Sequence, residues 1–173
     1  GKACNHYELY REDVNLIDSL GHQAYRMSIE WSRIEPMEGV WNNEAVEHYI
    51  SLLSLLQERG IKIFLTLHHF THPTWFAHMG GFTKTENIKY FERYMEFIVP
   101  KIAGFVDSWN VFNEFNLGLD EARFNAKMVI LRAHGRGYHI IKKYSSAPVS
   151  SAHAFVVYES KRRYDRFDNI MAD

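Results

Sequence analysis

Cysteine is nearly absent from this sequence, since Cys4 is the single one among 173 residues. One thiol cannot form a disulfide within the chain, which excludes a small scaffold held together by disulfides. A lone free thiol is also typical of a reducing compartment. We therefore expect a cytoplasmic protein.

Long apolar runs and an excess of charge of one sign are also missing. No run reaches the roughly 18 apolar residues of a membrane span, and no basic-then-apolar leader is present. We therefore expect neither a membrane-spanning segment nor a signal peptide. The 20 Lys and Arg residues nearly balance the 21 Asp and Glu residues. This balance gives no electrostatic reason to expect a nucleic acid or an anionic membrane as a partner.

The composition that remains is that of a globular domain. Hydrophobic residues make up 46% of the chain and charged residues 24%, close to the averages of folded proteins. At this length we expect one domain over residues 1–173. Aromatic residues are abundant at 15%, and such residues both fill cores and line small-ligand clefts.

Helical and strand-like segments alternate along the chain. Apolar residues recur at helical spacing in four segments, namely 9–20, 43–59, 85–98 (ending before Pro100) and 122–144. Short apolar runs of strand length lie between and after them, at 24–31, 61–67, 106–112 and 148–157. Such alternation predicts a parallel sheet covered by helices. The pattern leaves two α/β architectures open, an open doubly wound sheet and part of an eight-stranded barrel.

Polar residues gather where the expected strands end. Arg26 lies in the first strand, His69 follows the second, and Asn113 and Glu114 follow the third. The carboxyl ends of parallel strands are where α/β proteins bind ligands. Amide, imidazole and carboxyl groups together suit a site that binds hydroxyls and transfers protons. The alternatives are a surface Arg26 paired with Glu30, structural roles for His69 and Asn113, and a helix-capping Glu114.

The segment HHFTH, residues 68–72, contains three histidines and is therefore a candidate metal site. Metal ligands need a helical or strand spacing that aims them at one point, and Pro73 and the loop setting oppose this. We therefore predict no metal. A nucleotide cofactor is not expected either, because no Gly-rich phosphate loop stands between a strand and a helix.

Several stretches together resemble glycoside hydrolase family one, which contains β-glucosidases, β-galactosidases and 6-phospho-β-glycosidases. The matching stretches, in order, are HYELYREDVNLIDSLG, AYRMSIEWSRIEP, GVWNNEAVEHYISLLSLLQERGIKIFLTLHHFTHPTWF, GGF and WNVFNEFN. The resemblance implies a (β/α)8 barrel of which this chain covers roughly strands 2 to 5. It also implies an enzyme without a cofactor that acts on small β-glycosides or oligosaccharides.

The resemblance carries specific roles to this chain. Glu114 matches the acid/base glutamate of the family's Asn-Glu-Pro motif, and Asn113 matches the asparagine that binds the sugar 2-hydroxyl. His69 matches the histidine that binds the glycone, Arg26 matches the arginine beside the nucleophile, and Trp109 matches the motif's strand tryptophan. The nucleophile glutamate belongs to the seventh strand of the family barrel, outside this chain.

Two residues depart from the family pattern. Phe115 stands where the motif has proline, which restores a backbone N–H and frees the backbone angle φ. Phe70 stands where a tryptophan usually follows the glycone histidine.

From the resemblance as a whole, we expect a parent enzyme that hydrolyses β-glycosides with retention, while the isolated chain is inactive. The alternatives are a non-catalytic, truncated or sugar-binding homologue, and a member of another barrel glycosidase family.

Overall fold

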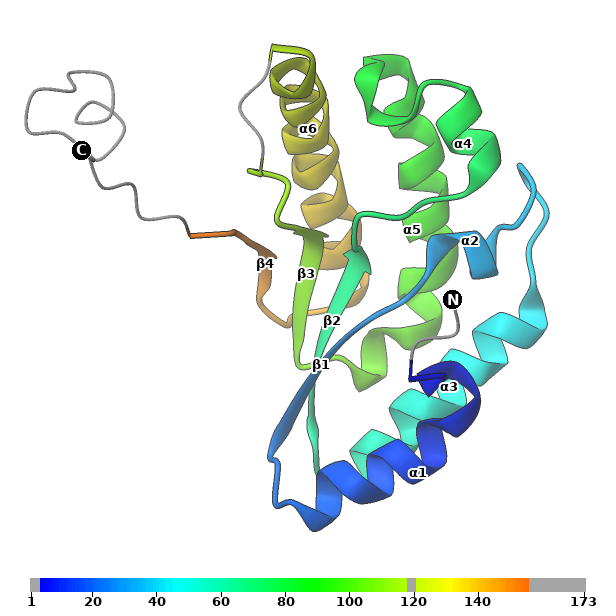
Figure 1. The fold of residues 1–173 in the computed structure, drawn as a ribbon, viewed down its shortest axis with the longest axis vertical. Coiled ribbons are helices and arrows are strands. Elements are labelled where there is room, and N and C mark those ends of the chain that lie inside the picture. Colours follow the sequence, from blue (N-terminus) through cyan, green and yellow to red (C-terminus); the bar gives the residue numbers. More distant parts are fainter. Residues whose placement is uncertain (1–3, 118–120, 156–173) are drawn as a thin grey trace, which may run out of the picture.

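The computed structural model describes residues 4–117 and 121–155 (Figure 1). Helices and strands alternate as expected. The strands are β1 Ala24–Ser28, β2 Lys62–His68, β3 Ser108–Asn113 and β4 Val149–Ala152. The helices are α1 His6–Ser19, α2 Trp31–Ile34, α3 Asn43–Glu58, α4 Thr74–His78, α5 Ile88–Ile102 and α6 Glu121–Tyr144. Three single 3-10 turns complete the described elements, namely η1 Gly81–Thr83, η2 Thr85–Asn87 and η3 Ala103–Phe105.

The four strands form one parallel sheet in chain order, β1-β2-β3-β4. Arg26 pairs in register with Phe64, which in turn pairs with Ser108. Since each strand lies beside the next one in the chain and runs in the same direction, all their carboxyl ends meet at one edge. The polar residues that follow the strands are therefore brought together there.

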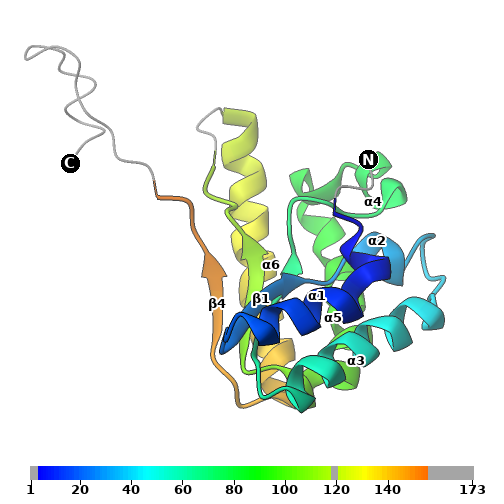
Figure 2. The ribbon, with the colours of Figure 1, turned by 60° about the horizontal axis from the view of Figure 1, so that its bottom comes forward.

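The two faces of the sheet differ in burial. Ile63, Leu65 and Leu67 are fully buried under helices α3, α5 and α6, which lie along one side of the sheet (Figures 1 and 2). Phe64, between them in the strand, is 40% exposed on the other face, and Arg26 is exposed as well. In the described part of the chain, the helices predicted to cover the sheet thus lie on one of its faces.

Local sequence signals set the ends of the elements. The Asn42 side chain accepts a hydrogen bond from the Ala45 N–H (3.1 Å) and caps the start of α3. Gly60, which follows this helix, has φ of 70°, a conformation that glycine adopts without strain. The first strand ends at Ser28, earlier than expected, because Glu30 caps the short helix α2 by accepting from Ser32 N–H.

Two further predicted boundaries, at α5 and β4, are wrong. Helix α5 continues through Pro100 to Ile102, because a proline in the last turn removes only one backbone hydrogen bond close to the helix end. Strand β4 spans four residues, a shorter strand than the expected 148–157. Residues 156 and 157 of that expected strand lie outside the described residues.

Candidate active site

Three neighbouring strands bring Arg26, Asn113 and Thr66 into contact. The Arg26 guanidinium donates a hydrogen bond from Nη2 to Asn113 Oδ1 at 2.6 Å, and the same nitrogen lies 3.4 Å from Thr66 Oγ1. Thr66 is fully buried and Asn113 is 5% exposed. The guanidinium therefore bridges β1 to β3 across β2 and fixes the orientation of the Asn113 amide.

Glu114 follows in a strained backbone conformation. Its φ is 45°, in the left-handed region that residues other than glycine rarely adopt, and its N–H donates to the Ala152 carbonyl at 2.7 Å. The pairing of β3 with β4 is also irregular between Asn110 and Asn113. Regular strand alternation would send Asn113 and Glu114 to opposite faces. The irregular pairing and the left-handed turn interrupt that alternation at the sheet's carboxyl edge.

His69 is positioned from the first strand. Its Nδ1 lies 2.9 Å from Ser28 Oγ, which leaves Nε2 to meet a ligand. Burial lowers the pKa of His69 from its ordinary value and the Arg26 charge lowers it further, whereas the Glu114 and Glu30 charges act in the opposite direction. Arg26, His69 and Glu114 therefore interact electrostatically at one edge of the sheet.

The loop after His69 is tied down by a hydrogen bond. Thr71 Oγ1 donates to Glu30 Oε2 at 2.6 Å, and Glu30 also accepts from the Ser32 side chain. The next residue after His69, Phe70, has φ of 66°. Phe70 is thus a second strained residue, after Glu114, beside the polar side chains of the site. Strained residues concentrate at functional sites.

His68 and His72 form a pair on the other side of this loop. His68 Nε2 lies 3.2 Å from His72 Nδ1, and burial lowers the pKa of His68 to about 3. The described residues contain no group of three or more His, Cys, Asp or Glu residues able to hold a metal ion. A metal-free site stays a prediction.

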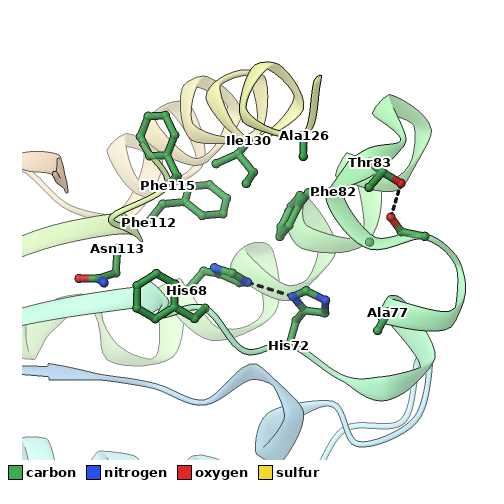
Figure 3. A pocket seen from close by; sticks show the side chains of 13 residues that line it. His68, His72, Ala77, Phe82, Thr83, Phe112, Asn113, Phe115, Ala126 and Ile130 are labelled. Carbon is green, nitrogen blue, oxygen red and sulfur yellow. Dashed lines mark hydrogen bonds between the residues drawn. The ribbon is translucent and has the colours of Figure 1, made fainter. Parts of the chain in front are cut away.

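A pocket of about 530 Å³ opens beside the polar cluster. Figure 3 shows Phe112 and Phe115 on the side of the pocket nearer to α6, and His68 and His72 on the side nearer to α4. Asn113 lies at the pocket's border with the Arg26 cluster. The edge of the sheet thus combines a polar cluster with an apolar cavity of ligand size.

The sequence matches one family over nearly its whole length. The model of glycosyl hydrolase family 1 covers residues 1–168. This chain belongs to that family. The match supports the resemblance seen in the strand-end motifs and favours it over another barrel glycosidase family.

The relatives are glycosidases and glycosyltransferases. The chain is 35% identical to β-glucosidase A of Acetivibrio thermocellus over 113 residues, which are 65% of the chain and 25% of that protein. It is 38% identical to the chloroplastic galactolipid galactosyltransferase of Arabidopsis thaliana over 109 residues, which are 60% of the chain and 18% of that protein. This family 1 chain therefore aligns with about a quarter or less of these relatives.

Solved structures confirm the fold. The β-glycosidase from Pyrococcus horikoshii superposes with a TM-score of 0.86 at 33% identity, over 98% of this chain and 44% of that one. The family 1 β-glucosidase from Thermotoga maritima superposes with a TM-score of 0.89 at 25% identity, over 98% and 41%. The family 1 chain is thus part of a (β/α)8 barrel. No described helix has the length and apolarity needed to cross a membrane.

The structure also decides between the readings of individual residues. Arg26 contacts Asn113 rather than Glu30, and Glu114 does not cap α6, which begins seven residues later. Trp109 is fully buried, and its Nε1 donates to Ser145 Oγ at 3.2 Å. The strand tryptophan therefore belongs to the core of this family 1 chain.

Sequence reasoning missed two supporting residues of the site. Ser28 and Thr66 lie opposite each other in the β1–β2 register, and they hold His69 and Arg26 respectively. A signal was present, because Ser28 follows Arg26 by two residues and a strand places such residues on the same face. Their hydrogen bonds to His69 and Arg26 depend on the pairing of β1 with β2, which the sequence does not show.

Proposed function

We propose that the complete protein hydrolyses β-glycosidic bonds by a retaining double displacement, and that this chain supplies the acid/base half of the site. One observation carries the proposal. Glu114 directly follows Asn113, which Arg26 binds, at the same sheet edge as His69. A carboxyl group beside fixed amide, imidazole and guanidinium groups is suited to bind a sugar and transfer a proton.

Each residue has a defined task in this reaction. Glu114 donates its proton to the glycosidic oxygen as the bond to the sugar breaks, and the nucleophilic carboxylate of the complete protein forms the glycosyl-enzyme. Glu114 then takes a proton from water, which attacks the sugar and releases it with retained configuration. Arg26 holds the nucleophile, while Asn113 and His69 bind sugar hydroxyls. This mechanism uses no metal or organic cofactor.

Replacing Glu114 with Gln in the complete protein tests the assignment. The amide cannot donate a proton, so hydrolysis of disaccharides, whose leaving groups need protonation, should fall at least a hundredfold. Formation of the glycosyl-enzyme from an activated dinitrophenyl glycoside should slow much less. Steady-state and burst kinetics measure both. Equal losses for the two substrates, or no loss, would show that Glu114 is not the acid.

Transfer of the sugar to an acceptor other than water is a second candidate. Two relatives carry transferase names, the galactolipid galactosyltransferase and a cyanidin 3-O-glucoside 7-O-glucosyltransferase of Delphinium grandiflorum. The same Glu114 would then deprotonate an acceptor hydroxyl in place of water. Product analysis with and without added alcohols separates the two activities, because a transferase accumulates the transfer product.

A non-catalytic homologue is the remaining alternative. Such a protein would bind a β-glycoside without turning it over. Isothermal titration with a disaccharide, combined with a turnover assay on the complete protein, distinguishes a binding module from an enzyme.

We further propose a cytoplasmic location, which rests on the single, exposed Cys4.

A further inference from the structure

We propose that Glu30 is a positioning residue, which holds the loop carrying His69 through Thr71 and so sets the contact between His69 and a sugar hydroxyl. The loop spans residues 69–73 and joins β2 to α4. This inference rests on the proposed glycosidase function, in which His69 binds the sugar. It adds a residue that does not touch the substrate but decides where a sugar-binding group lies.

The loop has a backbone conformation that needs support. Phe70 has φ of 66°, in the left-handed region that a phenylalanine rarely adopts. The Thr71 N–H donates to the His69 carbonyl at 2.8 Å, which closes a tight turn across Phe70. A strained turn persists only where the surrounding structure holds it. Since His69 is the first residue of this turn, its imidazole moves when the turn relaxes.

The Glu30 carboxylate supplies such a hold from the end of the neighbouring strand. Its Oε2 accepts a hydrogen bond from Thr71 Oγ1 at 2.6 Å. Its Oε1 accepts from the Ser32 hydroxyl at 2.7 Å and from the Ser32 N–H at 3.2 Å. One oxygen therefore binds α2 and the other binds the loop. Hydrogen bonds to an ionised carboxylate are stronger than those between neutral groups, so the contact with Thr71 opposes relaxation of the turn.

The backbone at Glu30 is itself firmly anchored. Its N–H donates to the Tyr49 hydroxyl at 3.1 Å, and Tyr49 is 5% exposed in α3. The residues on either side, Ile29 and Trp31, are buried. Trp31 Nε1 also donates to the fully buried Glu35 carboxylate at 2.9 Å. A carboxylate on so rigid a base fixes the position of the group that it binds.

Glu30 continues a series of positioning side chains that begins in β1. Arg26, Ser28 and Glu30 are two residues apart, and the backbone at Glu30 is still extended, so all three lie on the same side. Arg26 orients the Asn113 amide. Ser28 holds the His69 ring at Nδ1, and Glu30 holds the turn that follows His69. The ring and its backbone are thus fixed from one strand end.

A helix cap is the competing role for Glu30, because the same carboxylate caps α2. A cap uses only the oxygen that meets Ser32, and aspartate is one of the preferred residues for it. The Glu30 charge also reaches the loop, since burial lowers the pKa of His69 and of His72 and this charge opposes the lowering at both. Glu30→Asp separates the two roles, because the shorter side chain can still cap α2 but does not reach Thr71.

The test measures kcat/KM of the complete protein for an aryl β-glycoside and for its monodeoxy derivatives, each of which lacks one sugar hydroxyl. His69→Ala identifies the hydroxyl that His69 binds, because its loss disappears on the derivative without that hydroxyl. Thr71→Val and Glu30→Asp should each lower kcat/KM about tenfold on the full sugar and less than about twofold on that same derivative. Thr71→Ser, which keeps the hydroxyl, should stay within about twofold of the wild type.

A matched control removes another threonine hydroxyl. Thr85 is an exposed threonine of η2, and Arg132 Nη1 donates to its hydroxyl at 3.5 Å. Thr85→Val should leave kcat/KM unchanged on every derivative. Thermal melting accompanies each variant, and Thr71→Val should melt with the wild type, because Thr71 is exposed.

The outcome separates this inference from the proposed function. If His69→Ala is selective but Thr71→Val loses activity equally on every derivative, or loses none, the positioning role is overturned while the glycosidase function stands. Wild-type activity in Glu30→Asp would leave capping as the only role of Glu30. If the wild type turns over no glycoside, or if His69→Ala shows equal losses on every derivative, the proposed sugar contact fails and this inference fails with it.

Discussion

His68 is a titratable group buried in an aromatic core. It lies within ring-contact distance of Phe82, Phe91 and Phe112, and burial is the main reason that its pKa falls from 6.5 to about 3. The unfolded chain binds a proton near pH 6.5, whereas the folded chain binds it only near pH 3. The stability that this group contributes is therefore complete above pH 6.5 and is lost progressively as the pH falls towards 3.

We predict that acidification destabilises the fold through His68. Between pH 7 and pH 5 this residue alone should lower the free energy of unfolding by about 2 kcal/mol. His68→Phe, which keeps a ring but cannot be protonated, should flatten the pH dependence over that interval. Denaturant unfolding at the two pH values measures this change in the free energy of unfolding. The exposed His22→Gln serves as control, and an equally steep loss in His68→Phe would contradict the prediction.

Much of the candidate site could be predicted residue by residue, but its contacts could not. Residues at the carboxyl ends of strands converge in any parallel sheet, which is why His69 and Asn113 could be chosen as candidates from the sequence alone. Arg26 lies within β1 and reaches Asn113 through its long side chain. The left-handed backbone at Glu114 and Phe70 could not be predicted from the sequence, since glycine and asparagine are the residues that usually adopt it and neither residue is one of these. The ion pair between the buried Glu35 and the partly exposed Arg93 was missed as well, because its members lie far apart in the chain.

At the scale of elements, helix α6 approaches the sheet through a glycine. A Cβ placed on Gly137 would lie 2.9 Å from Met95 Sδ and 2.9 Å from Val111 Cγ1. Contacts this short require the neighbours to move, and Val111 is stiff because it is β-branched. The absent side chain at Gly137 therefore sets how closely α6 packs on α5 and β3.

A matched pair of substitutions tests this close approach. Gly137→Ala should destabilise the protein by about 1–3 kcal/mol, because overpacking outweighs the gain in helix propensity. Gly135→Ala, two residues earlier in the same helix with no atom within 4 Å of the added Cβ, should be neutral or stabilise by up to about 1 kcal/mol. Thermal melting compares them. Equal effects from both substitutions would show that α6 is not packed in this way.

Element types were easier to predict than element ends. The four long helices and four strands follow from apolar spacing, and the periodicity of 122–144 matches α6 almost residue for residue. The ends depend on local competition instead. Glu30 ends β1 early by capping α2, and Pro100 is tolerated because α5 is about to end. The short helices α2 and α4 were missed, since four or five residues are too few to show a period.

At the scale of the whole molecule, the sheet has one face that the described helices do not cover. Phe64 is 40% exposed on this face, and β1 and β4 each pair with one neighbour among the described strands. Unpaired strand edges and exposed apolar side chains favour association. We therefore predict that the isolated 173-residue chain is poorly stable and self-associates. Light scattering and thermal melting test this, and a monodisperse monomer with a sharp melt would contradict it.

The isolated chain should also lack glycosidase activity. A retaining double displacement needs a second carboxylate about 5 Å from the acid/base residue, and the sequence after Glu114 has no strand-end glutamate in the nucleophile motif. Release of a chromogenic phenol from an aryl β-glucoside measures turnover. Sustained turnover by the purified chain, free of host enzyme, would show that the chain contains both carboxylates.

The role of Glu114 is tested most directly by the stereochemistry of azide rescue in the complete protein. In Glu114→Ala, azide can occupy the vacated space and attack the glycosyl-enzyme without a general base. Our account predicts that azide restores turnover of an activated aryl β-glycoside and that the product is the β-glycosyl azide, identified by NMR. An α-glycosyl azide would make Glu114 the nucleophile, and no rescue would remove it from the acid/base role.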